Sequence, residues 1–173
     1  MGRVTTLDYF EIDVFATGAF TGNPLAVICG ADGLTGEQMR AIASWTNFSE
    51  TTFLLPPTHP EADYRVRIFT PTEEYEFAGH PTLGTARAWL ELGNTPRTPG
   101  RVVQECGVGD VEVRVDGPTL AFATPPLKRS GCLSDGERAE VCDTFGVEKR
   151  VPGQLLCAGT CQKLRCVTHG RLS

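Results

Sequence analysis

The sequence predicts an α+β fold in which short strands surround one buried helix. Three observations lead to this prediction. Several short segments are rich in β-branched and aromatic residues and are separated by turns containing Gly, Asn and Pro, which is typical of strands. The segment 35–45 is apolar mainly on one side, as in a surface helix. The segment 81–92 is apolar almost all round, so we expect this helix to lie inside the domain, wrapped by sheet.

The N-terminal part predicts two strands followed by an amphipathic helix. The strands, 9–15 and 24–29, are joined by the turn-forming stretch "ATGAFTGN". Thr35 is followed three residues later by Gln38, and this spacing is a capping box that predicts the start of a helix. The apolar face expected for this helix consists of Met39, Ile42, Ala43 and Trp45.

The central part predicts a strand-rich region with the buried helix in its middle. His80 is expected as the N-cap of this helix, and Pro81 stands in the first turn, where its missing N–H is tolerated. Gly93 is suited to end the helix. The strands expected around it are 51–56, 64–70, 101–106, 111–115 and 119–123.

The order of strand, turn, strand and capped helix begins again at Thr119, where Ser134 and Glu137 form a second capping box. This weak internal repeat predicts a first half-domain at 1–118 and the opening of a second half at 119–173. The tail "LRCVTHGRLS" lacks the alternating apolar pattern of a strand, so we expect no strand there.

The composition excludes several functional classes. The 173 residues carry 16 Lys and Arg against 21 Asp and Glu, a net charge of −5, and the basic residues are scattered singly. A nucleic-acid partner is therefore not expected. No apolar run approaches the roughly 20 residues that cross a bilayer, and the N-terminus lacks the pattern of a signal peptide. We expect a cytoplasmic protein that does not bind membranes.

The seven cysteines have no spacing typical of a disulfide scaffold. In a reducing compartment most of them are expected to be small buried apolar residues. The C-terminal cysteines form a C-x3-C-x4-C-x2-H pattern that could supply zinc ligands, but no second pair brackets a loop. We expect free thiols and no metal site. This pattern consists of Cys157, Cys161, Cys166 and His169.

Two stretches carry candidate catalytic residues. Glu50 stands between an aromatic residue and an aliphatic strand, where a carboxyl is poorly solvated as an anion and is suited to accept and return a proton. A strand-end Glu facing water is the alternative. At the start of the buried helix, Gly79 permits close approach and the unpaired N–H groups favour a substrate carboxylate beside His80. The alternative is that His80 only caps the helix.

The stretches "DVFATGAFTGNPLAVI", "NFSETTFLL" and "RIFTPTEEYEFAGHPTLGTA", in this order, closely resemble the PhzF-like phenazine-biosynthesis family, which shares its fold with diaminopimelate epimerase. The resemblance implies two pseudo-symmetric halves, each a curved, mostly antiparallel sheet around a central helix, with the active site between them. It implies that Glu50 is the general acid/base, that Gly79 and His80 line the substrate site, and that Asn23 lies near the same cleft.

The chemistry that this resemblance implies is an isomerisation. One carboxyl removes a proton from a small conjugated or cyclic carboxylate and returns it at another carbon, with no cofactor. Related epimerases use two thiols, and here the matching position is Glu50, so a two-thiol racemase is not expected.

Family chains are roughly twice as long as one such half, so we expect a chain truncated in its second half. A partial second half leaves strand edges and apolar surface uncovered, and a homodimer is one way to cover them. The alternative function is a non-catalytic interaction or regulatory module that keeps the fold without the reaction.

Overall fold

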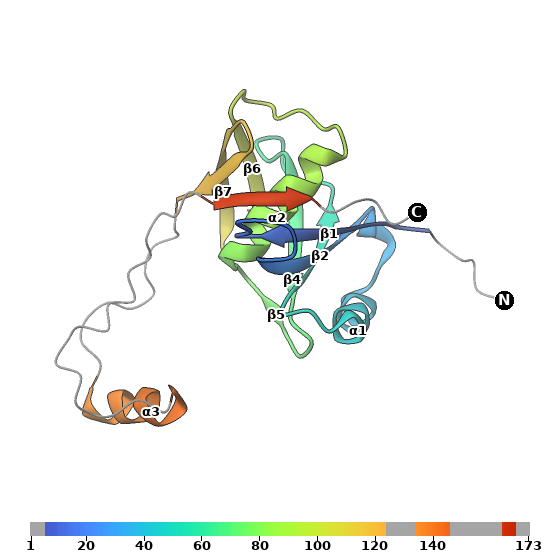
Figure 1. Cartoon of the computed structure of the whole chain (residues 1–173). Helices are drawn as coiled ribbons and strands as arrows, with labels where there is room; N and C mark the ends of the chain where they lie inside the picture. The colour runs from blue at the N-terminus through green and yellow to red at the C-terminus, as the bar shows by residue number, and fades with distance from the viewer. Residues whose placement is uncertain (1–5, 124–133, 146–163, 169–173) are drawn as a thin grey trace. The chain divides into compact units, whose positions relative to one another are not determined.

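The computed structural model describes residues 6–123, 134–145 and 164–168 (Figure 1). The chain divides into two compact units, one of residues 1–123 and 161–173 and the other of residues 124–160. The first unit contains a single sheet with the short 3₁₀ helix η1 (Ala31–Gly33) and the helices α1 (Gly36–Thr46) and α2 (Gly79–Glu91). The second contains α3 (Asp135–Phe145).

The sheet curls round into a closed circuit. Its strand order is β3-β2-β1-β9-β8-β7-β6-β4-β5, and β3 at one end also pairs with β4, the last strand but one, so the sheet closes on itself. The pairs β2–β3 and β4–β6 are parallel and the others are antiparallel, which confirms the mostly antiparallel sheet. The strands are β1 (Asp8–Val14), β2 (Asn23–Cys29), β3 (Thr51–Leu55), β4 (Tyr64–Phe69), β5 (Glu74–Tyr75), β6 (Arg101–Cys106), β7 (Gly109–Asp116), β8 (Thr119–Phe122) and β9 (Leu164–Thr168).

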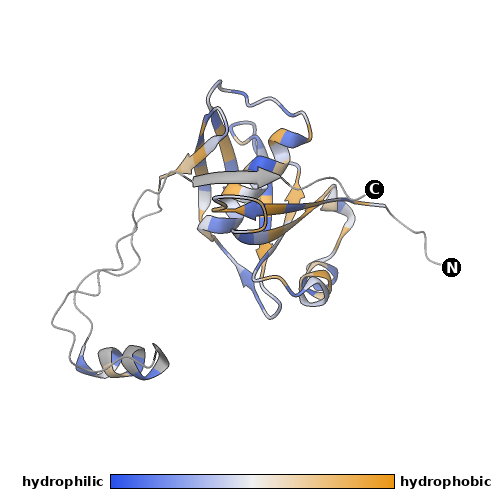
Figure 2. Ribbon diagram, in the orientation of Figure 1, coloured by the Kyte–Doolittle hydropathy of each residue, from blue (hydrophilic) through white to orange (hydrophobic). Residues whose placement is uncertain are grey.

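Helix α2 lies inside this curved sheet, as its all-round apolar sequence predicts (Figure 1). Hydrophobic segments of the surrounding strands are seen in Figure 2. Full burial of Leu83 contributes roughly 1.5–3 kcal/mol, the usual value for a large aliphatic side chain. The main core around the helix includes Ile12, Val14, Leu25, Val27, Val66, Ile68, Leu83, Ala86, Trp89, Val102, Val113 and Leu120.

The start of α2 differs from the sequence prediction. The N-cap is Ala78, not His80, and no side chain caps the helix. His80 is the second helical residue and Pro81 the third, so both lie in the first turn, where backbone N–H groups have no intrahelical acceptor. Pro81 is tolerated at any of these positions, and for this reason it does not fix the first residue of the helix. The end is as predicted, with the Gly93 N–H donating to the carbonyl of Leu90.

Helix α1 begins with the predicted capping box. Thr35 accepts a hydrogen bond from the backbone of Gln38, and the Gln38 side chain accepts one from the backbone of Thr35. Met39 and Ala43 are buried as expected, but the prediction for Trp45 is wrong, because 86% of this residue is exposed. Six residues separate Trp45 from Met39, and at 3.6 residues per turn this spacing turns it away from the buried face.

The helix expected after Ser134 is confirmed as α3, and Glu137 and Ser134 exchange the hydrogen bonds of the predicted cap. The prediction that the tail contains no strand is wrong. Strand β9 pairs with both β1 and β8, so hydrogen bonding to two neighbouring strands favours an extended backbone that the local pattern does not indicate. Cys166 lies on β9, whereas Cys157, Cys161 and His169 lie outside the described residues.

The predicted division at residue 118 stays a proposal. Strand β8, with which the second half is expected to begin, pairs with β7 in the same sheet as the first half. The contacts of the chain keep residues up to 123 together with that sheet.

Candidate functional site

The structure brings Glu50, His80 and Asn23 together from three elements. Strands β2 and β3 run side by side in parallel, so Asn23 at the start of β2 and Glu50 just before β3 lie at the same end of the sheet. His80 reaches them from the first turn of α2. Its Nδ1 lies 2.9 Å from Oε2 of Glu50, and its Nε2 lies 3.0 Å from the backbone oxygen of Asn23.

These two contacts show which ring nitrogen of His80 carries a hydrogen and leave two possible protonation states for its contact with Glu50. A backbone carbonyl only accepts hydrogen bonds, so Nε2 of His80 carries a hydrogen and donates it to Asn23. The contact between Nδ1 and Glu50 then needs one more proton. Either a protonated Glu50 donates to a neutral ring, or the ring is an imidazolium that donates to a Glu50 carboxylate. In both states, the contact holds a proton that the pair can release.

The pair is largely shielded from water. Only 18% of the Glu50 side chain and 8% of the His80 side chain are exposed. The ring of Phe15 is tilted against the His80 ring at a centroid distance of 6.1 Å. The Glu50 carboxyl is therefore not a strand-end group in bulk water, the alternative that the sequence left open.

Asn23 contributes to this arrangement through its backbone, which sequence reasoning did not predict. Its carbonyl holds His80, while its side-chain oxygen accepts a hydrogen bond of 3.4 Å from the hydroxyl of Ser49. The side chain thus links the start of β2 to the residue just before Glu50.

A chain of polar groups inside the sheet holds the first turn of α2. The hydroxyl of Tyr64 donates to Gln104 over 3.0 Å, and the amide of Gln104 donates to the hydroxyl of Thr82 over 3.1 Å. Thr82 donates to the carbonyl of Ala78, the N-cap. Burial raises the pKa of Tyr64 well above its usual value, so its hydroxyl keeps the proton that this chain requires. The position of the helix start is therefore set from β4 and β6.

Gly79 is the first residue of α2, and its missing side chain is needed for packing. A Cβ at this position would lie 2.8 Å from Cζ of Phe122, well inside van der Waals contact. The ring of Phe122 in turn stacks edge-on with Phe77, at a centroid distance of 5.6 Å. The close approach that the sequence predicted at Gly79 is thus made by an aromatic ring of β8.

The two cysteine thiols whose side chains the structure describes lie elsewhere and stay protonated. Burial, with a contribution from Asp8, raises the pKa of Cys29 to about 12. Burial also raises the pKa of Cys106. A thiol nucleophile or base must ionise near neutral pH, so neither of these groups is suited to that role.

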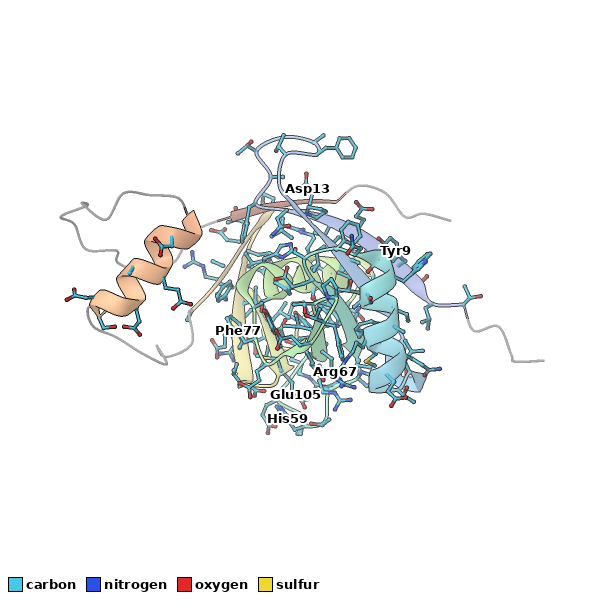
Figure 3. The ribbon with its side chains drawn as sticks, turned by 90° about the horizontal axis from the view of Figure 1, so that it is seen from below. Tyr9, Asp13, His59, Arg67, Phe77 and Glu105 are labelled. Atoms are coloured by element: carbon cyan, nitrogen blue, oxygen red, sulfur yellow. The ribbon has the colours of Figure 1, made fainter. Side chains whose placement is uncertain are left out.

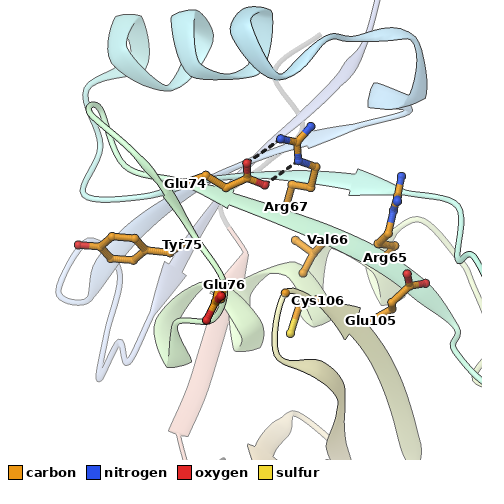
Figure 4. Close-up of a pocket in the computed structure, with 9 residues that line it drawn as sticks. Arg65, Val66, Arg67, Glu74, Tyr75, Glu76, Glu105 and Cys106 are labelled. Carbon is orange, nitrogen blue, oxygen red and sulfur yellow. Dashed lines mark hydrogen bonds and ion pairs between the residues drawn. The ribbon is translucent and has the colours of Figure 1, made fainter. Parts of the chain in front are cut away.

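A pocket of about 450 Å³ lies on another part of the sheet, between β4, β5 and the turn from β6 to β7 (Figure 4). Three of its charged groups, Arg67, Glu74 and Glu105, form hydrogen bonds within the protein. Arg67 donates two hydrogen bonds of 2.6 Å to Glu74, and Glu105 accepts from the backbone and hydroxyl of Thr58. Glu50, His80 and Asn23 do not line this pocket, so we place the candidate active site at the start of α2.

Two residues near the site were not predicted from sequence, Asp13 and Phe15. Phe15 contacts the His80 ring, and Asp13 is a buried carboxylate at the end of β1 that binds the backbone of the following loop. In the pairing of β1 with β2, Asp13 lies opposite Pro24, which has no N–H to donate. The proline is visible in the sequence, but its position opposite Asp13 is visible only in the structure.

A curved sheet closed around a helix is the architecture of one half of the diaminopimelate epimerase-like fold class. Comparison with known proteins identifies the family. Residues 12–130 match the family model of phenazine biosynthesis-like proteins, PhzC-PhzF, and the chain belongs to this family.

Curated relatives agree with this assignment. Antisense-enhancing sequence 1 of Schizosaccharomyces pombe is 48% identical over 159 residues, which are 88% of this chain and 53% of that protein. Trans-2,3-dihydro-3-hydroxyanthranilate isomerase of Pseudomonas aeruginosa is 51% identical over 80 residues, 46% of this chain and 28% of the relative. Relatives in Mesorhizobium japonicum and Pseudomonas aeruginosa are named as isomerases.

The fold is also found among solved structures. A predicted epimerase from Pseudomonas aeruginosa superposes with a TM-score of 0.70 and is 30% identical, over 83% of this chain and 52% of the other. The chain thus spans about half the length of the fission-yeast relative and of this solved structure. In the part of the chain that the structure describes, no helix has the length and hydrophobicity needed to span a membrane.

Proposed function

We propose that this protein is an isomerase that moves a proton between carbons of a small conjugated or cyclic carboxylate, with Glu50 as the general acid/base. The observation that carries the proposal is the contact of 2.9 Å between Oε2 of Glu50 and Nδ1 of His80 at the start of α2. A carboxyl that shares a proton with an imidazole can release it to a substrate carbon and recover one from another carbon.

In this proposal the substrate carboxylate binds at the N-terminus of α2. The first backbone N–H groups of a helix have no intrahelical acceptor, and the helix dipole favours negative charge there. Gly79 and His80 are the first two helical residues, and Pro81 has no N–H, so the two amides of 79 and 80 are the donors that such an anion would meet. Asn23 contributes by holding the His80 ring.

In this proposal, the amides that bind the substrate carboxylate lie close to Glu50, so Glu50 can transfer a proton at a carbon near that carboxylate. The carboxylate of a conjugated acid acidifies the C–H bond next to its double bond. With that carboxylate on the helix start, the carbon skeleton extends from the same helix turn that carries His80, and His80 holds Glu50. The reaction needs no redox step, because the substrate gains at one carbon the proton that it loses at another.

The proposal is tested by hydrogen exchange with solvent. Wild-type protein and Glu50→Gln are incubated in D₂O with a panel of dihydro-hydroxybenzoate-like acids, beginning with trans-2,3-dihydro-3-hydroxyanthranilate, the compound named in the isomerase of Pseudomonas aeruginosa. Mass spectrometry of each acid measures the deuterium that it gains. We expect wild-type protein to label at least one acid and Glu50→Gln to label it about 10²- to 10⁴-fold more slowly.

Glu61→Gln is the matched control, since Glu61 is a carboxylate that also bonds to a histidine, His59. This control should label the same acid at the wild-type rate. Equal labelling by wild-type protein and Glu50→Gln would remove Glu50 from the mechanism. Labelling of no acid by the wild-type protein would instead support the non-catalytic module.

A further inference from the structure

We propose that Asp13 is a positioning residue, which keeps the His80 ring in its Nε2–H form by holding the carbonyl of Asn23 in place. This inference rests on the proposed role of the Glu50–His80 pair. Asp13 accepts hydrogen bonds from the loop between β1 and β2, and in this proposal its effect on His80 is transmitted through the backbone of that loop.

The Asp13 carboxylate closes the base of that loop. Only 5% of Asp13 is exposed, and its oxygens accept hydrogen bonds from the N–H of Gly22 over 2.9 Å and of Thr21 over 3.2 Å. Figure 3 shows Asp13 at the end of the sheet from which this loop projects. The N–H of Gly22 belongs to the peptide group between residues 21 and 22, so one peptide group separates this bond from the Asn23 carbonyl that holds His80.

The local sequence explains why a side chain, and not the backbone, binds the N–H groups of this loop. Asp13 lies opposite Pro24 in the pairing of β1 with β2, and proline has no N–H for the ladder. The carboxylate therefore supplies the cross-strand bonds at this point of the hairpin. Gly22 allows the approach, since a Cβ there would lie 2.5 Å from Oδ1 of Asp13 and would also overlap the carbonyl oxygen of Val14.

The loop itself has a conformation that needs such an anchor. Phe15 and Phe20 have positive φ angles of 66° and 61°, which side-chain-bearing residues adopt only at a cost in energy. The hydroxyl of Thr21 stabilises the tip of the loop by accepting hydrogen bonds from the N–H groups of Thr17 and Gly18. These bonds lie within the loop, whereas the bonds of the Thr21 and Gly22 N–H groups to Asp13 tie the loop to β1.

The consequence for His80 follows from its two hydrogen bonds. While the carbonyl of Asn23 is in place, the ring hydrogen stays on Nε2, and Nδ1 faces Glu50 ready to accept its proton. If that carbonyl moves away, the hydrogen on Nε2 loses its acceptor, and the pair can release one of its two protons to solvent. The remaining ring hydrogen can then lie on Nδ1 and donate to a Glu50 carboxylate, so that the pair holds one proton in place of two.

The test reads the ring directly. The full chain is labelled with ¹⁵N at its histidine rings, and nitrogen–proton correlation spectra are recorded from pH 6 to 9 without substrate. In wild-type protein we expect Nε2 of His80 to keep its hydrogen throughout this range. In Asp13→Ala we expect its signal to move toward the average of the two tautomers. His59 is the internal reference, and its signals at each pH should be the same in the wild-type protein and in the variant.

Two further variants separate positioning from a general loss of structure. Asp13→Asn keeps one acceptor oxygen and should restore most of the wild-type His80 signal. Thr21→Val removes the bonds within the loop but leaves the N–H groups on Asp13, so His80 should again resemble wild type. A His80 spectrum unchanged in folded Asp13→Ala would overturn the inference, and so would an equal shift in Thr21→Val.

If Asp13→Ala does not fold, Asp13→Asn decides the question. Because Asn offers one acceptor oxygen for two N–H groups, we expect a small shift of His80 in the same direction, together with faster exchange of the Thr21 or Gly22 amide. Faster amide exchange without any shift of His80 would contradict the inference. The readout needs no substrate, so its failure is distinguishable from a failure of the proposed isomerase activity.

Discussion

Two histidines of this chain bond to carboxylates at almost the same distance, but their surroundings differ. His80 lies 2.9 Å from Glu50, and its other nitrogen donates to a backbone carbonyl. His59 lies 3.1 Å from Glu61 through Nδ1 and 3.0 Å from Asp110 through Nε2. Only 8% of the His80 side chain is exposed, compared with 34% for His59. His59 lies at the end of the sheet away from Asp13 (Figure 3).

This difference separates an ion pair from a candidate acid/base. Carboxylates on both nitrogens favour a ring with two hydrogens, so His59 is suited to tie its loop to the β6–β7 turn. The hydrogen bond to Glu61, and then the charge and hydrogen bond of Asp110, raise the pKa of His59. At His80 one acceptor is a neutral carbonyl and water is largely excluded, so a proton can be exchanged with Glu50. Distance to a carboxylate alone does not distinguish the two sites.

The largest effect that the comparison predicts is on activity. His80→Gln removes the ring that exchanges a proton with Glu50, and we expect deuterium labelling of the substrate to fall about 10²-fold, at the lower end of typical acid/base contributions. His59→Gln should label substrate at the wild-type rate. Initial rates measured by mass spectrometry make the comparison. A similar decrease of the labelling rate in both variants would contradict a specific role of His80 in proton transfer.

The next effect is on stability. In His80→Ala the carbonyl of Asn23 and the carboxyl of Glu50 lose a partner in a largely buried place, which costs about 1–3 kcal/mol of the free energy of unfolding. His59→Ala should have a smaller effect, because exposed ion pairs contribute little and are screened by salt. Urea unfolding followed by circular dichroism measures both. A greater loss in His59→Ala would contradict the assignment of the buried site.

The smallest effect is the pH dependence due to His59. Its pKa is raised in the folded protein, so its contribution is fully present below the unfolded value of about 6.5 and is lost as the pH rises through the folded pKa. The urea midpoint of wild type minus that of His59→Gln should therefore decrease between pH 6 and pH 9, and less steeply in 1 M NaCl. A difference that grows with pH would mean that His59 folds as a neutral ring.

The sequence predicts best those features that depend on residues close together in the chain. The capping boxes at Thr35 and Ser134 give their helix starts correctly, and the all-round apolar pattern of α2 gives its place inside the sheet. Pro81 marks the first turn of α2 but not its first residue, because proline is tolerated throughout that turn. The prediction that Trp45 lies on the buried face of α1 is wrong, because the apolar character of a residue does not show at which angle around the helix axis its side chain projects.

Features that depend on distant pairing could not be predicted. Strand β9 is extended because β1 and β8 both pair with it, and nothing in its own residues indicates this. For the site, family motifs identify Glu50 and His80, but only the structure shows that these residues, 30 positions apart in the chain, lie within hydrogen-bond distance. The role of the Asn23 carbonyl is not visible in sequence, since every residue has one.

The central claim, that one carboxyl both removes and returns the proton, is tested most directly with substrate deuterated at the carbon that loses its hydrogen. After a single turnover in H₂O, the product is analysed by mass spectrometry for deuterium at the carbon that gains one. Because only 18% of the Glu50 side chain is exposed, we predict that part of the label is carried over by the wild-type protein. A product that contains hydrogen from solvent alone would contradict the account.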